Sequence, residues 1–435
     1  MRTVKIEKQV PIVGSYDVVV CGGGPAGFIA AITAAREGAR TALIERYGFL
    51  GGMATAGYVS PISEFKFDDA IVIGGVPWEF IERLEAMDGA FVERDIGNIA
   101  FDPERYKLCA QRMVLEAGVT LYTNSYLTGC VCENNIIRQV IIENKNGAEA
   151  IESKVFIDAT GDADLAYAAH VPMQPMNGES LQPLSTYFIL QGVDTSSPMI
   201  QEAMHHNKQG KNCHCLPVRE KLLEMMKTRE MPNFGGPWFC TLLRDGAVTV
   251  NMTRTTANAC DNRDYARAEC QLREDVFTLA DLLRQTFPEF KNARVASVAV
   301  QAGVRETRRI VGVHTVTGEE YVNAVHYEDS VSHGIHPIDI HSSKQSEQYT
   351  YFLKQPAYVP YRALIAPDYP NLLVAGRCLS ADRQAFASLR VQGSCMDMGQ
   401  AAGAAAAQCA ASGNPVQKAD VPELIAHLKA LGARL

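Results

Sequence analysis

Three arginines lie close together in the segment RETRR, at Arg305, Arg308 and Arg309. A guanidinium can hold a carboxylate through two parallel hydrogen bonds, so one of these side chains could bind an acidic substrate. If the segment is a β-strand, Arg305 and Arg309 share one face and Arg308 lies on the other. The structural alternative is an ion pair, for instance with Glu306. We assign Arg305 to a candidate catalytic site.

A histidine in the segment HPIDIHSS offers a different chemistry. His341 follows Asp339 in this segment, and an imidazole can take up or release a proton near neutral pH. We therefore assign His341 to the same candidate site, with a hydrogen-bonded loop histidine as the alternative. Further candidates of suitable residue type are His333, His336, Tyr361, Arg362 and Arg390.

The elements that must position these side chains begin with a glycine motif near the N-terminus. An apolar, β-branched run at 16–21 predicts a buried strand, and the glycines that follow it have the spacing G-x-G-x-x-G. Gly22 permits a tight turn, Gly24 lets a phosphate approach the backbone, and Gly27 lets the next helix pack closely. Pro25 suits the first turn of that helix. The ligand contacts expected at this turn are Gly22, Gly24, Pro25, Ala26 and Gly27.

An acidic residue completes the motif. A second predicted strand, TALIE, ends at Glu45, which stands 18 residues after Gly27. A carboxylate at about this distance, roughly 20 residues, accepts hydrogen bonds from an adenosine ribose, while the helix N-terminus binds a pyrophosphate. The spacing therefore predicts a dinucleotide, FAD or NAD, with a glycine-rich turn of another α/β protein as the alternative. The loop ERYGFLGGMATAG favours FAD, because in a plain nicotinamide dehydrogenase the crossover would continue into another helix.

The motif resembles that of flavoproteins in the glutathione-reductase-like superfamily. More closely, the chain resembles the FAD-dependent oxidoreductase family that is related to the flavoprotein subunits of fumarate reductase and succinate dehydrogenase. The likeness extends over nearly the whole chain and implies FAD as the cofactor. The segments that carry it are VFIDATGDADLAYAAH (155–170), QAGVRETRRIVG (301–312), HPIDIHSS (336–343), VPYRALIAPDYPNLLVAGRCLSAD (359–382) and ASLRVQGSCMDMGQAAGAAAAQC (387–409).

The resemblance also implies which further residues contact FAD. The alanine-rich closing helix should begin at about Gly399 and point its positive N-terminal end at the flavin. Arg390, which precedes this helix, should reach the flavin edge or the substrate, so we assign Arg390 to the catalytic site. The other expected contacts lie in loops and turns that approach the cofactor. The full set of further contacts is Arg46, Gly51, Gly52, Met53, Leu127, Thr160, Gly161, Asp162, Gly376, Arg377, Met398 and Gly399.

We expect an α/β fold with a Rossmann-like, glutathione-reductase-type FAD-binding domain that is discontinuous, formed by residues 1–170 and 357–435. A mixed α+β substrate domain, residues 171–356, should be inserted and cap the flavin. Strand-like runs at 185–193 and 246–254, and the amphipathic segment after them, predict its sheet and a long helix. Because no second glycine motif indicates a nicotinamide domain, the hydride partner should be the substrate, a soluble electron carrier or another protein.

The composition argues against several classes of protein. The chain has 435 residues, 47% of them hydrophobic, and a formal net charge of -8, which predicts a large core and argues against a basic nucleic-acid-binding surface. No apolar run reaches the roughly 18 residues of a membrane span, and the first residues lack an apolar signal-peptide core. We therefore expect a soluble, cytoplasmic protein whose scattered cysteines are reduced.

Two features bear on metal binding and on the attachment of the cofactor. A short segment holds several ligand types, but their spacing does not match common zinc sites, so we expect no metal there. Its members are His205, His206, Cys213, His214 and Cys215. In the succinate dehydrogenase relatives a histidine near the glycine-bearing loop tethers the flavin. No histidine or cysteine adjoins Gly51 and Gly52 here, so FAD should be bound non-covalently.

These observations predict an oxidoreductase that moves a hydride between FAD and a small organic molecule. The substrate could be an unsaturated or hydroxylated carboxylate held by arginine, or a sugar or glycoside alcohol oxidised with His341 as base. The first alternative is a non-catalytic flavin-binding subunit that docks to an electron-transfer partner. A lyase that uses the flavin structurally is the second.

Overall fold

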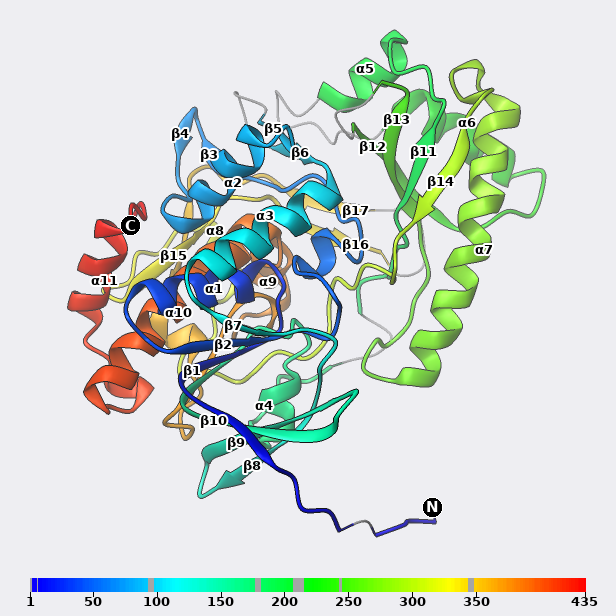
Figure 1. The fold of residues 1–435 in the computed structure, drawn as a ribbon. Coiled ribbons are helices and arrows are strands. Elements are labelled where there is room, and N and C mark those ends of the chain that lie inside the picture. The colour runs from blue at the N-terminus through cyan, green and yellow to red at the C-terminus, as the bar shows by residue number, and fades with distance from the viewer. Residues whose placement is uncertain are drawn as a thin grey trace.

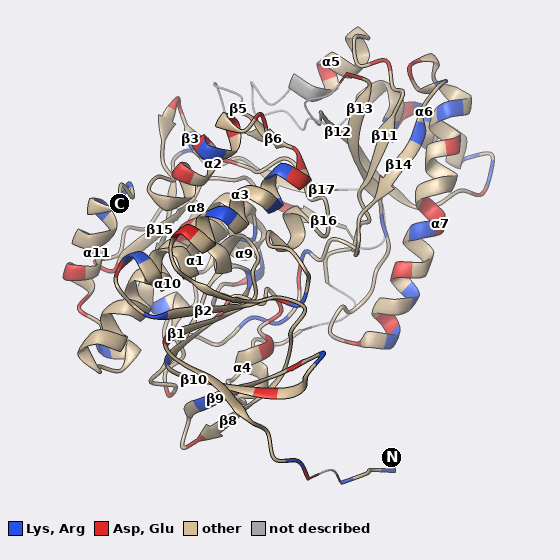
Figure 2. Ribbon diagram, in the orientation of Figure 1, with Lys and Arg blue, Asp and Glu red and all other residues tan. Residues whose placement is uncertain are grey.

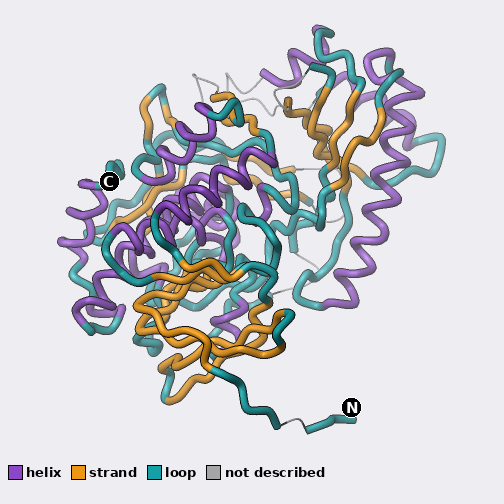
Figure 3. Tube along the Cα trace, in the orientation of Figure 1, coloured by secondary structure: helices purple, strands orange, loops and turns teal. Residues whose placement is uncertain are grey.

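The computed structural model describes residues 2–5, 7–92, 98–176, 181–205, 215–241, 245–342 and 348–435. A larger sheet with helices packed on it forms one lobe, and a second sheet with its own helices lies beside it at the upper right of Figure 1. Figure 3 shows helices packed against the strands of the larger lobe. The chain therefore has a mixed α/β fold.

The larger sheet is built around the strand predicted from the first apolar run. This strand, β1 (Ile12–Cys21), pairs in parallel with β2 and β10, and β2 and β10 pair in parallel with β7 and β19. Two further strands, β8 and β9, extend the sheet in antiparallel fashion. Their bounds are β2 (Thr41–Ile44), β7 (Thr120–Tyr122), β8 (Tyr126–Glu133), β9 (Ile136–Asn144), β10 (Gly147–Asp158) and β19 (Leu372–Val374).

Alternate side chains of β1 enter two different cores, because successive residues of a strand point to opposite faces. Val18 and Val20 pack in the core that contains the large helices, and Val19 and Cys21 pack in the core beneath β8 and β9. The helices of the first core are α1 (Pro25–Arg36), α2 (Val76–Ala86), α3 (Pro103–Glu116), α9 (Arg383–Leu389), α10 (Gln392–Ser412) and α11 (Val421–Ala430). Helix α4 (Asp164–Ala168) belongs to the second.

The second sheet is entirely antiparallel, with the order β12-β13-β11-β14. The strand-like runs at 185–193 and 246–254 are confirmed as β11 and β13, and the amphipathic segment is helix α7, which starts where Asp261 caps it. Charged residues of both signs recur along α7 (Figure 2). The bounds are β11 (Phe188–Gln191), β12 (Phe234–Thr241), β13 (Ala247–Thr253), β14 (Arg294–Val298), α5 (Pro198–His205), α6 (Leu216–Met226) and α7 (Asn262–Thr286).

After β14 the chain returns to the larger lobe. The core that contains the large helices also buries residues that lie well before residue 357, namely Val316, Tyr321, Val331 and Ile338. The remaining elements of both lobes are β3 (Lys66–Phe67), β4 (Ala70–Ile71), β5 (Ala90–Val92), β6 (Ile99–Phe101), α8 (Gly318–Val322), β15 (Ser330–Gly334), β16 (Ile338–His341), β17 (Gln348–Tyr351) and β18 (Ala357–Pro360). Among the described helices, none combines the length and apolar character that crossing a membrane requires.

A buried acid on α10 makes the stability of the fold depend on pH. Asp397 is 2% exposed and accepts a hydrogen bond of 2.8 Å from the backbone N–H of His333. Burial raises the pKa of Asp397 to about 7, because the bond from His333 offsets only part of the lost hydration. The unfolded chain ionises near the ordinary value of about 3.9. Between these pH values the native state therefore holds a proton that the unfolded state lacks.

We expect this proton to make the stability of wild type depend on pH differently from that of Asp397→Asn. Asparagine keeps an acceptor for His333 and is neutral at every pH. The wild-type free energy of unfolding should fall relative to the variant's as pH rises from about 4 to about 7, by at most about 1.4 kcal/mol per pH unit. Urea unfolding at pH 5 and 8 measures this difference. The exposed change Asp281→Asn is the control, and parallel curves for wild type and Asp397→Asn would contradict the assignment.

Candidate active site

The three glycines of the first turn are needed for different physical reasons. Gly22 has φ +98°, and a Cβ there would lie 2.5 Å from the carbonyl oxygen of Ala159. A Cβ on Gly27 would lie 1.7 Å from the Gly22 oxygen. Gly24 has an ordinary φ of -70°, and its Cβ would meet only the Cα of Gly52 at 3.8 Å. Backbone and packing therefore explain Gly22 and Gly27, whereas Gly24 borders open space.

That open space is a cavity of about 380 Å³ that extends from the first turn to the region between the two sheets. It brings together most residues singled out in the sequence. Three of them, Arg305, His341 and Arg390, are the candidate catalytic residues, and all three line it. The expected cofactor contacts that line it are Gly22, Gly24, Pro25, Ala26, Glu45, Arg46, Gly52, Met53, Leu127, Thr160, Gly161, Gly376 and Arg377.

Five expected contact residues do not line the cavity: Gly27, Gly51, Asp162, Met398 and Gly399. Gly399 instead lets α10 approach α1, because a Cβ there would lie 2.2 Å from the Ala26 oxygen. A Cβ on Gly51 would similarly meet Thr55 and Tyr106.

The other two are held by the fold as well. Asp162 accepts hydrogen bonds from Thr307 at 2.7 Å and Arg377 at 3.1 Å. Met398 is fully buried in the core that contains the large helices. Asp162 therefore positions Arg377, which does line the cavity.

Glu45 lies where β2 ends and is 5% exposed. Its two carboxylate oxygens accept hydrogen bonds from the backbone N–H groups of Gly23 at 2.7 Å and Tyr47 at 2.9 Å. Burial raises the pKa of Glu45, and these two bonds act against that rise. An ionised carboxylate offers about four acceptor sites, so both oxygens keep capacity for a hydroxyl donor. The carboxylate is thus fixed at the edge of the glycine turn.

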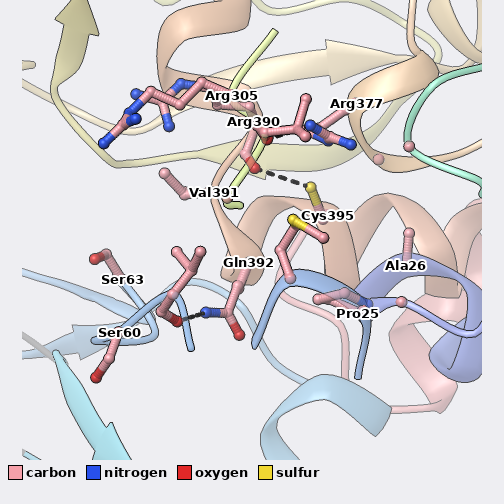
Figure 4. A pocket seen from close by; sticks show the side chains of 18 of the residues that line it. Pro25, Ala26, Ser60, Ser63, Arg305, Arg377, Arg390, Val391, Gln392 and Cys395 are labelled. Carbon is pink, nitrogen blue, oxygen red and sulfur yellow. Dashed lines mark hydrogen bonds between the residues drawn. The ribbon is translucent and has the colours of Figure 1, made fainter. Parts of the chain in front are cut away.

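The closing helix meets the cavity earlier than expected. Helix α10 begins at Gln392, not near Gly399, because Val391 takes the extended conformation of an N-cap and the polar residues after it continue the helix. Val391, Gln392 and Cys395 line the cavity (Figure 4), and the Gln392 side chain donates a hydrogen bond of 2.7 Å to the Val59 oxygen. The positive end of the helix dipole therefore faces the cavity at Val391–Gln392.

The arginine-rich segment is not a strand, and that expectation was wrong. Residues 301–309 form one isolated bridge, from Gly303 to Ser185, and each arginine lies in a different environment. Arg308 pairs with Asp164, and Arg309 pairs with Glu306 at 2.9 Å. The proposed structural alternative therefore holds for Arg309. Only Arg305 of the three lines the cavity.

Asp339, His341 and Arg390 form a connected group at the far end of the cavity. The His341 Nε2 lies 3.0 Å from Asp339 Oδ2, and Arg390 Nη2 lies 3.2 Å from the same oxygen. Burial acts to raise the pKa of Asp339, but the His341 and Arg390 side chains outweigh it and the pKa lies below its usual range. Burial lowers the pKa of His341 to about 3 against the opposing charge of Asp339. At neutral pH the group is an ionised acid beside a neutral imidazole.

The other candidates fall into separate places. His336 lines the cavity, with its ring 3.7 Å from Glu64. His333 is buried against Tyr358 outside the cavity wall. The Tyr361 hydroxyl donates to a backbone oxygen at 2.8 Å, and Arg362 forms an exposed pair with Asp329; neither lines the cavity.

Of the His/Cys cluster, residues 206–214 lie outside the described residues, as does the side chain of His205. Cys215 is buried at the start of α6 and packs in the core of the second sheet.

The second sheet supplies wall residues that sequence reasoning missed. Tyr187, Trp238 and Asn251 line the cavity beside Arg305 and His341, and the Trp238 ring meets the His341 ring edge-on at 5.7 Å. Trp238 is one of only two tryptophans in the chain, which was the available signal. Its position near His341 depends on how the two lobes meet.

The chain matches the model of a protein family described as FAD dependent oxidoreductase over residues 17–428. It is 34% identical over 160 residues to a dihydrolipoyl dehydrogenase from Trypanosoma brucei brucei, covering 36% of this chain and 32% of that protein. It is 28% identical over 153 residues to digeranylgeranylglycerophospholipid reductase 1 from Methanococcoides burtonii, covering 34% and 38%. These matches span about a third of the curated relatives' length.

Among solved structures, a flavin-dependent brominase is similar in fold with a TM-score of 0.50 and 14% identity, covering 96% of this chain and 84% of that chain. The cavity agrees with a dinucleotide that carries a flavin. Gly24 borders open space at the N-terminus of α1, and the fixed carboxylate of Glu45 lines the same cavity. The chain belongs to the FAD dependent oxidoreductase family, and its cofactor is FAD.

Proposed function

We propose that the protein transfers a hydride between non-covalently bound FAD and a small organic substrate. The observation that carries this proposal is the continuity of one cavity, which is lined by the glycine turn at one end and by Arg305, His341 and Arg390 at the other. Bound FAD supplies the hydride acceptor or donor. The substrate-facing side chains then need only hold the substrate and move a proton.

The nucleotide end of the cavity has the groups that a dinucleotide requires. The bare backbone at Gly24 and the N-terminus of α1 would hold the pyrophosphate, and Glu45 would accept from the ribose. Leu127 and Arg46 line the same end. The backbone turn at Thr160–Gly161 and the Gly376–Arg377 turn would enclose the middle of the cofactor.

The substrate end has a proton carrier in a defined state. Because His341 is neutral at physiological pH, it can accept a proton from a substrate hydroxyl as the substrate is oxidised. Asp339 orients the ring through the 3.0 Å contact at Nε2 and favours the imidazolium that forms. Arg390 keeps Asp339 ionised. In the reverse direction the imidazolium would return the proton.

We further propose that the two sheets belong to two domains, as expected from the sequence, with the substrate-facing domain inserted into a discontinuous FAD domain. The second sheet has a core of its own, formed by residues such as Phe188, Val250 and Leu279, and this supports the division. Val316 and Val331 are buried in the core that contains the large helices, which favours an insertion that ends near β14 and not at residue 356.

An anaerobic screen tests the proposed function. The purified yellow protein is mixed with small hydroxy acids, enoates, sugars and glycosides, and the flavin absorbance is followed. We expect at least one class to bleach the oxidised flavin or to reoxidise the flavin after dithionite reduction. Flavin that responds to dithionite and to a protein electron carrier, but to no metabolite, would contradict the proposal and favour an electron-transfer subunit.

A further inference from the structure

Two buried arginines beside the cavity form hydrogen bonds to neutral groups. Arg254 and Arg305 are 5% and 7% exposed, and both donate to the hydroxyl of Ser185, at 2.5 and 2.8 Å. Their other acceptors are neutral: the Asn251 side-chain oxygen and backbone carbonyls. Within the described part of the chain, no carboxylate forms an ion pair with either guanidinium.

This arrangement differs from that of the other arginines in the same region. Arg308, Arg309 and Arg377 are each paired with an aspartate or glutamate. Burial lowers the pKa of Arg254 well below its usual range, and the charge of Arg305 adds to that effect. Burial also lowers the pKa of Arg305 to about 10. The charge of Asp339 acts on both guanidiniums, but its carboxylate is already bonded to His341 and Arg390. Two adjacent buried cations without a carboxylate of their own are costly, and an anion between them and the cavity would offset that cost.

The acids that line the cavity already have other partners. Asp339 contacts His341 and Arg390, and Glu64 lies against His336. The remaining two wall acids, Glu45 and Asp164, are bonded to the glycine turn and to Arg308.

Of the two arginines, Arg305 lines the cavity and Arg254 does not. Arg305 lines the cavity directly (Figure 4). Arg254 lies behind Trp238, with its guanidinium carbon 5.3 Å from the indole ring, and its Nη2 is buried and finds no hydrogen-bond partner among the residues that the structure describes. An anion in the cavity would therefore meet Arg305 first, with Arg254 behind it.

The wall next to Arg305 is aromatic. Tyr187, Trp238 and Phe239 line the inner part of the cavity. Phe91 and Phe352 also line it and are 49% and 39% exposed, which places them at its mouth. Phe91 belongs to β5, Trp238 and Phe239 belong to β12, Phe352 follows β17 and Tyr187 directly precedes β11, and the cavity brings all five together. Flat apolar side chains of this kind bind ring-shaped or similarly bulky apolar groups.

We propose that the substrate is a small carboxylate that carries a ring, with its carboxylate held by Arg305 and its ring packed against Trp238 and Tyr187. Arg254 is a positioning residue that acts through the shared Ser185 hydroxyl and the charge behind Arg305. This inference rests on the proposed function and names the substrate class of that same site.

Three small probes separate the two parts of the proposal: benzoate has a charge and a ring, benzamide has the ring alone, and acetate has the charge alone. We expect benzoate to perturb the absorption spectrum of the FAD-loaded protein with a dissociation constant at least tenfold below those of benzamide and acetate. Arg305→Gln should weaken benzoate at least tenfold and leave benzamide unchanged. Arg254→Gln should weaken benzoate, and Arg254→Lys should restore part of the loss. Exposed Arg273→Gln on α7 is the control.

Each outcome bears on the inference. Equal affinity for benzoate and benzamide in wild type would overturn the carboxylate assignment, and equal affinity for benzoate and acetate would overturn the ring assignment. Inorganic phosphate that competes more strongly than benzoate would assign the arginines to a phosphate. Should Arg305→Gln fail to fold, Arg305→Lys must still weaken benzoate selectively. Protein that retains no FAD would refute the proposed function itself, whereas FAD-loaded protein that reacts with a metabolite but ignores benzoate would refute only this inference.

Discussion

Gly24→Val should give a folded protein that purifies without FAD. The backbone at Gly24 has a φ of -70°, which valine adopts, and the nearest atom to a new Cβ is the Gly52 Cα at 3.8 Å. The empty protein therefore has room for the side chain. A bound pyrophosphate does not, because it must approach the bare backbone at this position. The absorbance ratio at 450 and 280 nm, about zero for the variant, measures the loss.

The chain offers a matched control for this change. Gly129 in β8 also has open space where a Cβ would lie and no positive φ, but it does not line the cavity. Gly129→Val should purify yellow with the wild-type flavin content. Stoichiometric FAD in Gly24→Val would show that the pyrophosphate lies elsewhere. If valine at the helix N-cap prevents folding, Gly24→Ala should still weaken FAD binding while its circular dichroism spectrum stays unchanged.

The contrast among the glycines also shows what local sequence can predict. The strand, turn and helix around Gly22 follow from residues that are neighbours in the chain, so their spacing was sufficient to predict both the fold and the ligand. The prediction for Glu45 is also local, because it depends only on the strand that follows the first helix. The spacing predicts that Gly27 serves packing and that Gly24 serves the ligand. The structure adds the contacts: a Cβ on Gly27 would lie 1.7 Å from the Gly22 oxygen, whereas Gly24 borders the cavity.

The substrate end could be predicted only in part, because its residues come from three distant parts of the chain. Arg305 and His341 were singled out by type, but nothing local distinguished Arg305 from Arg309, whose partner Glu306 neutralises it. Trp238 lies on the second sheet and Arg254 directly follows β13, and their approach to His341 and Arg305 depends on packing between the lobes. Propensity and periodicity carry no information about such long-range contacts.

His341→Gln should slow flavin reduction by the substrate about 100- to 10,000-fold, the range expected when a general base is lost, while FAD stays bound. Glutamine can still donate to Asp339, so the wall should keep its shape, but it cannot accept the substrate proton. Stopped-flow absorbance under anaerobic conditions, with the metabolite found in the screen, measures the rate. Dithionite reduction, which needs no base, should be unchanged. The exposed change His427→Gln on α11 is the control.

The pH dependence distinguishes a buried base from an ordinary histidine. Because burial lowers the pKa of His341 to about 3, the free enzyme should keep a neutral imidazole throughout the range from pH 5 to 9. The acid limb of kcat/KM, which reports free-enzyme pKa values, should therefore lie below pH 5 and not near the usual histidine value of about 6.5. A carboxylate bound at Arg305 would neutralise part of the positive charge that depresses this pKa, so the limb of kcat should lie at higher pH than that of kcat/KM. A kcat/KM limb at pH 6.5 that persists in His341→Gln would assign the base to another residue.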